Sequence, residues 1–537
     1  MMQPLPAPLS DAFESALSQL EHERFVERIW RRDHTLWSPE PREIADRLGW
    51  LDLLETDEPL RRVASIVEEA HAEDVGHIVL LGMGGSSLGG EALASTFGPQ
   101  EGYPRLLVLD STVPDRVRQV RAAIDPRRTL FIAASKSGGT AEVQALFDYF
   151  WGEVTGSDDP GRRFLAITDP GTPLAALGVE RGFREVFLNT PDVGGRFSVL
   201  TLFGVVPAAL AGIDMRRLLG RAERARRACG PQHPGEENPG LLLGTYLAVA
   251  ALLGRDKATL LVPRRVADFG LWAEQLLAES TGKNGKGIVP VAGEPFVEPA
   301  AYGDDRAFVH LRLTSEPDAE VEAQAARLRE AGQPVWELTL AHRWDLGAQF
   351  FLWQFATAVA GHLLDVHPFD QPNVESAKKS TREVLAQWET SGKLPAVEAP
   401  ADLAAELRRE KPAYVALLGY LAPDSALEAS VARLRRALIE ELHVATTFGY
   451  GPRYLHSTGQ LHKGGPPGGL HVEVVPRAMA DLPIAGRRYG FATLAGAQAE
   501  GDLLALRDAN RRFVRITSAD PAADLARMAE GLLTGPG

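Results

Sequence analysis

Two stretches rich in glycine and hydroxyl side chains follow apolar runs that are typical of buried strands. The first, GMGGSSLGG, comes directly after HIVLL, and the second, SKSGGT at residues 135–140, comes after TLFIAA. Glycine lets a backbone turn sharply and approach a ligand, and the amides that open the next helix attract anions. A turn with a helix cap explains either stretch alone. The pair, with Lys136 in the second stretch, predicts a cradle for a phosphate group.

A dinucleotide site is the alternative interpretation of the first stretch. Gly82 and Gly84 begin a GxGxxG pattern, and Asp110 stands where a ribose-binding carboxylate would. Ser87 occupies the third glycine position, however, so the pattern is incomplete. Residues 281–287, TGKNGKG, also lack the register of a nucleotide-binding P-loop. A dinucleotide leaves the second stretch unexplained, so the phosphate interpretation is favoured.

Charged groups also stand near the predicted ends of helices. Arg196 follows two glycines and precedes an apolar helical run, where a guanidinium opposes the helix macrodipole. Glu279 falls on the last turn of another predicted helix, and the macrodipole disfavours a carboxylate there, which suits a general base. Gln371 and Lys378 are seven residues apart on a helix that Pro372 starts, so both can face one side. The structural alternatives are an interdomain salt bridge for Arg196 and solvent exposure for Glu279 and Lys378.

The elements that must position these residues are short apolar strands alternating with longer amphipathic helices. Such alternation predicts parallel sheets with helices on both faces, and hence an α/β fold of doubly wound sheets. A long, largely buried helix is predicted over residues 345–364. The predicted strands are residues 77–82, 105–110, 129–134, 164–169, 185–189, 258–263, 308–313 and 334–340, followed by YVALLGY, LHVEVV and FVRITS near the C-terminus.

Shifts in pattern divide the 537-residue chain into four parts. Residues 1–70 are predicted to form N-terminal helices. Two doubly wound units follow, at 71–228 and 241–385, and the Pro/Gly/Glu-rich stretch CGPQHPGEENPG (229–240) links them. Residues 400–537 have the same texture and predict a smaller C-terminal α/β region.

Composition limits the partners of the chain. Lysine and arginine number 57 against 71 acidic residues, a formal charge of −14, so neither nucleic acid nor an anionic membrane surface is expected as a partner. Cys229 is the single cysteine, which excludes an intrachain disulfide and fits a reducing cytoplasm. The N-terminus lacks the apolar core of a signal peptide, and the longest apolar runs are too short to span a bilayer. We therefore expect a cytoplasmic protein with a small-molecule partner.

Five motifs, in the same order, resemble those of the phosphoglucose isomerase family. They are a glycine–serine loop, here GMGGSSLGG; a Ser-Lys-x-x-x-Thr loop, here SKSGGT; VGGRxS, here VGGRFS; ESNGK, here ESTGK; and FDQxxVExxK, here FDQPNVESAK. The motifs extend over about residues 80–385. The resemblance implies the family fold, in which two sugar-isomerase (SIS) domains are each a doubly wound parallel sheet.

The resemblance also implies an activity and a role for each matching residue. The activity is that of an aldose–ketose isomerase that interconverts glucose 6-phosphate and fructose 6-phosphate through a cis-enediolate, in glycolysis and gluconeogenesis, with no metal and no cofactor. Glu279 is implied as the base that moves a proton between C2 and C1, and Arg196 as the cation that stabilises the enediolate. Gln371 and Lys378 are implied as ligands near the phosphate and the ring oxygen. The implied contacts of the sugar and its 6-phosphate are Gly85, Ser86, Ser135, Lys136, Ser137 and Thr140.

The sequence departs from the family in two places. The histidine that assists ring opening in the family is absent from YGDDRAF (302–308), where Arg306 takes its place. The C-terminal region contains GPRYLHSTGQLHKGGPPGG (451–469), which resembles the isomerase half of transaldolase–phosphoglucose isomerase fusions. His456 in this stretch is our predicted substitute for the missing histidine, with His462 second. The alternative is a surface loop whose histidines cap turns.

Two other functions stay open from the sequence. A phosphomannose or dual-specificity isomerase would differ in the configuration at C2, which leaves no mark in these motifs. A non-catalytic sugar-phosphate-binding module would share the serine loops but has no reason to keep Glu279, Arg196 and Lys378 together. The resemblance further implies a homodimer with the site near the interface.

Overall fold

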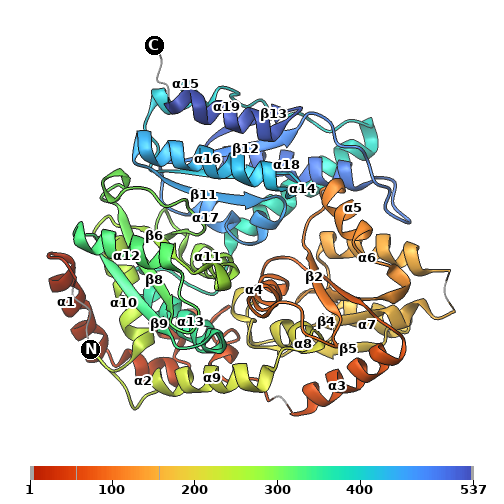
Figure 1. The fold of residues 1–537 in the computed structure, drawn as a ribbon, viewed down its shortest axis with the longest axis horizontal. Helices are drawn as coiled ribbons and strands as arrows, with labels where there is room; N and C mark the ends of the chain where they lie inside the picture. Colours follow the sequence, from red (N-terminus) through yellow and green to blue (C-terminus); the bar gives the residue numbers. More distant parts are fainter. Residues whose placement is uncertain (1–4, 56, 157, 534–537) are drawn as a thin grey trace.

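A computed structural model describes residues 5–55, 57–156 and 158–533, and it contains three parallel sheets, each surrounded by helices (Figure 1). The predicted α/β class of doubly wound parallel sheets is confirmed. The sheets follow one another along the chain, with strands β1–β5 first, β6–β9 next and β10–β13 last. Within the described residues, no helix combines the length and apolar character needed to cross a membrane.

The first sheet has the strand order β2-β1-β3-β4-β5, and all its strands are parallel. Its unit contains α3 (Asp57–Ala72), β1 (His77–Leu81), α4 (Leu88–Phe97), β2 (Arg105–Leu109), α5 (Pro114–Ala122), β3 (Thr129–Ala134), α6 (Ala141–Val154), β4 (Phe164–Thr168), α7 (Pro173–Glu180), β5 (Glu185–Leu188), α8 (Leu202–Leu210) and α9 (Met215–Ala228). Ile78 and Leu80 of β1 pack against α3 and α8, while Val79 and Leu81 pack against α5 and α6. Because side chains alternate along a strand, burial on both faces explains the continuous apolar runs.

The carboxyl edge of this sheet brings the two glycine-rich stretches together. The chain passes from β1 to β2 on one side and then returns to β3 on the other side of β1. Open α/β sheets bind ligands at such a switch point, beyond the carboxyl ends of the strands. GMGGSSLGG follows β1 and SKSGGT follows β3, so both stretches lie at this point.

The second sheet has the order β7-β6-β8-β9. Its unit contains α10 (Pro239–Leu252), β6 (Lys257–Leu261), α11 (Asp268–Thr281), β7 (Val289–Val291), β8 (Arg306–Leu313), α12 (Ala319–Glu330), β9 (Val335–Leu340) and α13 (Leu346–Leu363). Helix α13 is the long buried helix that the sequence predicts, and it shares a large core with α10 and with the N-terminal helices α1 (Leu9–His22) and α2 (Phe25–Trp30). Strand β7 was not predicted, because it has only three residues, one of them Pro290.

The third sheet has the order β11-β10-β12-β13. Its unit contains α14 (Pro372–Ser391), α15 (Leu403–Arg409), β10 (Tyr414–Gly419), α16 (Ser425–Leu442), β11 (Ala445–Tyr450), α17 (Gly459–Gly464), β12 (Gly469–Pro476), α18 (Phe491–Asp508), β13 (Arg512–Ser518) and α19 (Pro521–Leu533). Most of helix α14 falls within 241–385 of the sequence division, but we describe it with the third unit because Thr381 packs against Gly501 of α18. Strand β11, ATTFGY, was not predicted, because its two threonines break the apolar run. The second, first, third and fourth strands of each sheet are thus neighbours in that order, so the three units share one topology.

The third unit packs against both of the others, and Figure 1 shows it lying across them. One hydrophobic core combines Val113 of the first unit, Ala278 of the second and Tyr414 of the third. The hydroxyl of Thr112 donates a hydrogen bond to Oε1 of Gln498, in α18, at 2.6 Å. The C-terminal region therefore packs against the first and second units and shares a buried core with both.

A buried ion pair joins the second unit to the third. Arg306, at the start of β8, is completely buried, and its guanidinium donates to Oε2 of Glu294 and to the hydroxyl of Thr259, both at 2.8 Å. Glu294 in turn accepts a hydrogen bond from the backbone amide of Thr446, in β11, at 2.8 Å. The guanidinium that stands in place of the family histidine is therefore part of a structural contact between two sheets.

Replacing Arg306 with Met is expected to destabilise the protein, because it leaves the Glu294 carboxylate buried without its cation. Loss of one partner of a buried pair costs about 3–5 kcal/mol, whereas an apolar pair of similar volume is far less costly. Urea unfolding should therefore show a large loss for Arg306→Met and a smaller one when Glu294→Met is added. An Arg306→Met variant as stable as the wild type would contradict the assignment of Arg306 to a structural ion pair.

Candidate active site

A cavity of about 280 Å³ opens where the second glycine-rich loop meets α14 and the turn before α17. Four residues singled out from the sequence line it, Ser137, Thr140, Lys378 and His456. They come from the first and third units, and Lys378 lies 238 positions after Thr140 in the chain. The structure thus joins the hydroxyl-rich loop to the stretch in which the sequence predicts a substitute histidine.

The first glycine-rich loop packs closely against two other segments, those that carry His456 and Gly195. Gly84 has φ +54°, and a Cβ there would lie 2.5 Å from the carbonyl oxygen of His456. A Cβ on Gly85 would lie 2.0 Å from the carbonyl oxygen of Gly195. Both approaches require glycine, because a Cβ would overlap these backbones. Ser86 is buried in the same short turn, η3 (Gly84–Ser86).

The second loop holds its hydroxyls in a fixed arrangement at the start of α6. The hydroxyl oxygens of Ser135 and Thr140 are 2.8 Å apart, so one donates to the other. Gly138 has φ +66°, which bends the loop back toward the helix. Thr140 is the residue before α6, so the first amides of that helix lie beside the cavity that Thr140 and Ser137 line. Free amides at a helix start favour an anion.

Lys136 has a carboxylate partner within the protein. Its ammonium forms an ion pair with Asp169, at the end of β4, and donates to the carbonyl of Pro191 at 2.8 Å. Burial raises the pKa of Asp169, and the neighbouring Lys136 opposes that effect. The sequence led us to expect an anion beside Lys136, and Asp169 occupies that place. Lys136 therefore stiffens the base of the loop, while Ser137 and Thr140 line the cavity.

Arg196 lies in the turn η6 (Gly195–Phe197) and is 2% exposed. Its guanidinium reaches across to the second unit, and Nη1 lies 3.1 Å from Oε1 of Glu279. Its hydrogen bonds go to the hydroxyl of Ser280 (2.8 Å), the carbonyls of Pro368 (2.7 Å) and Asp370 (2.9 Å), and Oε1 of Gln371 (2.9 Å). Arg196, Glu279 and Gln371 thus form one cluster.

Glu279 lies on the last turn of α11, as the sequence predicts, and Gln275 lies one turn before it. The Gln275 amide donates both to Oε2 of Glu279, at 3.0 Å, and to the carbonyl of His456, at 2.8 Å. This side chain therefore links the Arg196–Glu279 cluster to the segment that carries His456. Sequence reasoning missed Gln275; its place one helical turn from Glu279 is the signal that could have found it.

His456 lies at the end of η10 (Arg453–His456), and its Nε2 is 2.9 Å from Oε1 of Glu142. Burial alone would raise the pKa of Glu142, but nearby His456 and Lys378 outweigh it and lower that pKa. A carboxylate held in its charged form orients the imidazole toward the cavity. Glu142 was also missed, although it follows the SKSGGT loop by two residues.

His462, the second-choice histidine, lies in α17 and is 1% exposed. Its ring packs against that of His471, with centroids 5.1 Å apart. Burial holds the pKa of His462 well below its usual value. His462 is a core residue of the third unit and does not line the cavity.

Helix α14 starts at Pro372, as predicted, and carries Lys378 on the wall of the cavity. The Lys378 ammonium donates to Glu375 at 2.8 Å, and the side chain is 48% exposed. Arg382, one turn further on, lines the same cavity. Gln371 precedes the helix and turns toward Arg196 instead. Lys378 therefore lies at the cavity, whereas Gln371 lies at the cluster of Arg196 and Glu279.

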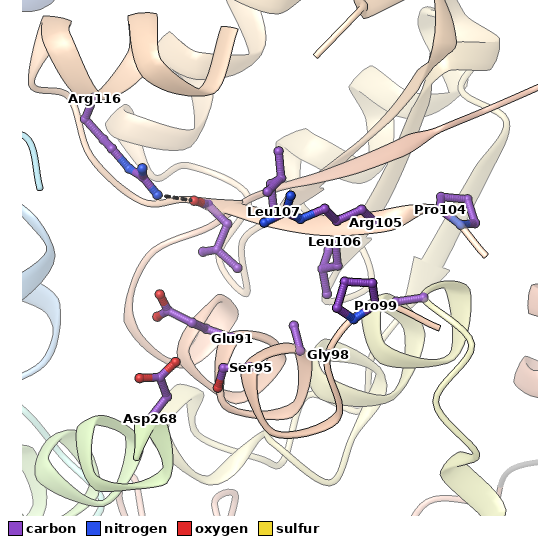
Figure 2. Close-up of a pocket in the computed structure, with 13 residues that line it drawn as sticks. Glu91, Ser95, Gly98, Pro99, Pro104, Arg105, Leu106, Leu107, Arg116 and Asp268 are labelled. Carbon is purple, nitrogen blue, oxygen red and sulfur yellow. Dashed lines mark hydrogen bonds between the residues drawn. The ribbon is translucent and has the colours of Figure 1, made fainter. Parts of the chain in front are cut away.

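A second cavity, of about 340 Å³, lies between α4 and the edge strand β2. Figure 2 shows Glu91 and Asp268 on one side of it and Arg116 on the other, with the guanidinium of Arg116 turned to the carbonyl of Val108, 3.2 Å away. None of the residues singled out from the sequence lines this cavity. The candidate site is therefore the cavity that His456 lines, with the adjoining cluster of Arg196 and Glu279.

Known proteins of one family are similar to this chain. The phosphoglucose isomerase family model matches residues 62–289, a range that contains both glycine-rich loops, Arg196 and Glu279. The glucose-6-phosphate isomerase of Thermus thermophilus is 33% identical over 392 residues, which cover 64% of this chain and 91% of that relative. The glucose-6-phosphate isomerase of Rubrobacter xylanophilus is 29% identical over 386 residues, which cover 63% of this chain and 89% of that relative.

Solved structures share the fold. A hypothetical protein from Thermus thermophilus aligns with a TM-score of 0.61 and 29% identity, over 72% of this chain and 100% of that one. A glucose-6-phosphate isomerase from Chlamydia trachomatis aligns with a TM-score of 0.54 and 20% identity, over 68% of this chain and 78% of that one. With 33% identity across 91% of a curated relative, this chain belongs to the phosphoglucose isomerase family.

Proposed function

We propose that this chain is an aldose–ketose isomerase that interconverts glucose 6-phosphate and fructose 6-phosphate. Two relatives named glucose-6-phosphate isomerase align with this chain over 91% and 89% of their own length. The observation that carries the proposal is the contact of Glu279 with the buried guanidinium of Arg196 at 3.1 Å. A carboxylate and a fixed cation side by side, next to a hydroxyl-lined cavity, are the groups that proton transfer next to a carbonyl requires.

The phosphate of the substrate is placed against the second loop. Ser137, Thr140 and Ser135 offer hydroxyls there, and the first amides of α6 favour negative charge. Lys378 and Arg382 approach from α14 on the opposite wall. Hydrogen bonds from charged donors to phosphate oxygens are short and strong, so α14 supplies the positive charge, while Lys136 serves Asp169. Gly85 and Ser86 then lie along the sugar.

The reacting carbons are placed at the cluster of Arg196 and Glu279. Glu279 removes the proton from C2 of open-chain glucose 6-phosphate, the C1–C2 double bond forms, and O1 takes up negative charge. A proton passes from O2 to O1, and Glu279 returns its proton to C1, which leaves the ketone at C2. Arg196 lies where this charge develops, and one such donor contributes about 10²–10³-fold in rate. Gln371 keeps the guanidinium in place from the other side.

Ring opening is assigned to His456 together with Glu142. The substrate in solution is mostly a closed ring, so a proton must reach the ring oxygen and another must leave the C1 hydroxyl before isomerisation. The imidazole of His456 is held by Glu142 at 2.9 Å and lines the cavity. Histidine transfers protons readily near neutral pH. Lys378, on the facing helix, is placed near the ring oxygen.

The alternatives gain no support from the site. Among the described residues, no contact favours a mannose phosphate over a glucose phosphate at C2. A binding module without activity would need the hydroxyl-rich loop alone. Here the carboxylate of Glu279 and the guanidinium of Arg196 also lie side by side, 3.1 Å apart. Because Gln275 donates both to Glu279 and to the carbonyl of His456, this pair adjoins the cavity that His456 lines, which favours catalysis.

We further infer a cytoplasmic enzyme of glycolysis and gluconeogenesis that assembles as a homodimer. A lone cysteine that is buried, Cys229, suits a reducing compartment. The homodimer rests on the family resemblance.

Replacing Glu279 with Gln is expected to lower kcat by about 10²–10⁴-fold, because a positioned base contributes that much. The change is nearly isosteric, so KM should move little. Glu237→Gln, at a carboxylate that is 83% exposed, is the control and should match the wild type. Solvent-hydrogen exchange at C2, followed by NMR, measures the same step directly. Substantial exchange by Glu279→Gln would remove Glu279 as the base.

Replacing His456 with Asn is expected to impair substrates that must open a ring and to spare those that need not. Erythrose 4-phosphate carries its phosphate on the oxygen that would close a five-membered ring, so it reacts without ring opening. We expect kcat/KM for fructose 6-phosphate to fall by about 10²-fold or more and that for erythrose 4-phosphate to stay within about threefold. Equal losses on both substrates would contradict the assignment.

A further inference from the structure

The guanidinium of Arg453 ties the turn that carries His456 to the first unit, in addition to the contact of the His456 ring with Glu142. Arg453, three residues before His456, reaches out of the third unit, and its Nε lies 2.5 Å from Oδ2 of Asp110. Its Nη2 forms a second ion pair, with Glu91 of α4. The Arg453 side chain is 16% exposed, so both carboxylates meet it in a largely dry interface.

These carboxylates are themselves fixed to the first glycine-rich loop. The hydroxyl of Ser87 lies 3.2 Å from the carbonyl of Gly84 and 3.4 Å from Oδ2 of Asp110, and its single proton can be donated to either. Glu91 lies on the helix that follows this loop, where Figure 2 labels it. Arg453 therefore binds two carboxylates that adjoin the loop against which the backbone of His456 packs.

The rest of the turn is held from the other side. The hydroxyl of Tyr454 donates to Asp502 of α18 at 2.9 Å, within the third unit. Arg453 and Tyr454 are adjacent, but the first is bound to the first unit and the second to the third unit. The turn η10 therefore crosses the interface between the first and third units at Arg453.

We propose that Arg453 is a positioning residue for His456, and that its ion pairs with Asp110 and Glu91 place the imidazole for ring opening. This inference rests on the proposed function. A guanidinium matches two carboxylates with fixed geometry, whereas lysine provides one point charge. Loss of these two ion pairs should therefore displace His456. Glu279 of the second unit and Arg196 of the first unit should keep their places.

The chain offers a matched control at the same interface. Arg487, which follows β12, pairs with Asp148 of α6, with Nε 2.9 Å from Oδ2. This pair also ties the third unit to the first, and neither residue lines the candidate cavity. Loss of Arg487 should weaken the interface without moving η10.

The experiment compares Arg453→Gln, Arg453→Lys and Arg487→Gln with the wild type on fructose 6-phosphate and on erythrose 4-phosphate, together with urea unfolding. A displacement of about 1 Å in a catalytic group costs about 10²-fold. We expect Arg453→Gln to lose roughly 10- to 100-fold in kcat/KM on fructose 6-phosphate and little on erythrose 4-phosphate. Arg453→Lys should recover part of this loss, and Arg487→Gln should keep the wild-type ratio between the two substrates.

Equal losses on both substrates, or the same selective loss in Arg487→Gln, would overturn the inference. If Arg453→Gln does not fold, Asp110→Asn and Glu91→Gln remove the partner charges and should show the same selectivity. A wild type inactive on both substrates would refute the proposed function instead. A selective loss in His456→Asn with none in Arg453→Gln would leave the function standing and reject Arg453 as the positioning residue.

Discussion

The burial of one guanidinium is the constraint on which the site depends. Arg196 belongs to the first unit, but its side chain is bonded to the second unit and to the segment before α14, through Ser280, Pro368, Asp370, Gln371 and Glu279. A buried cation is tolerated only when its donors are satisfied. The two units must therefore meet in one relative position. Within the first unit, Gly85 leaves room for the backbone of η6, which carries Arg196.

The third unit completes the site with the same topology that built the other two. All three sheets place their first four strands in one order, so each has a switch point at its carboxyl edge. In the third sheet the chain after β11 leaves this edge and enters the first unit, where the hydroxyl of Ser111 meets the carbonyl of Gly451 at 3.4 Å. The segment that continues from Gly451 carries His456 to the cavity. The C-terminal unit, which extends beyond the family motifs in the sequence, thus supplies one wall of the candidate cavity.

The sequence predicted the groups whose residue types conflict with their local position, and it missed those that matter only through distant partners. Glu279 at a helix end is unusual by itself. Glu142 gains meaning from His456, which is 314 residues away in the chain, and no local pattern carries that contact. Strands β7 and β11 were missed for a related reason: one is short and the other polar, and pairing with the neighbouring strands makes them strands. The partner of Lys136 was likewise hidden, because Asp169 follows a different strand, β4.

A crystal structure with fructose 6-phosphate bound tests the central claim most directly. We predict that the phosphate lies against residues 135–140, that C1 and C2 lie beside Glu279 and Arg196, and that the imidazole of His456 faces the ring oxygen. A phosphate seated elsewhere, such as beside Arg116 in the second cavity, or a sugar whose reacting carbons lie away from Glu279, would contradict this account.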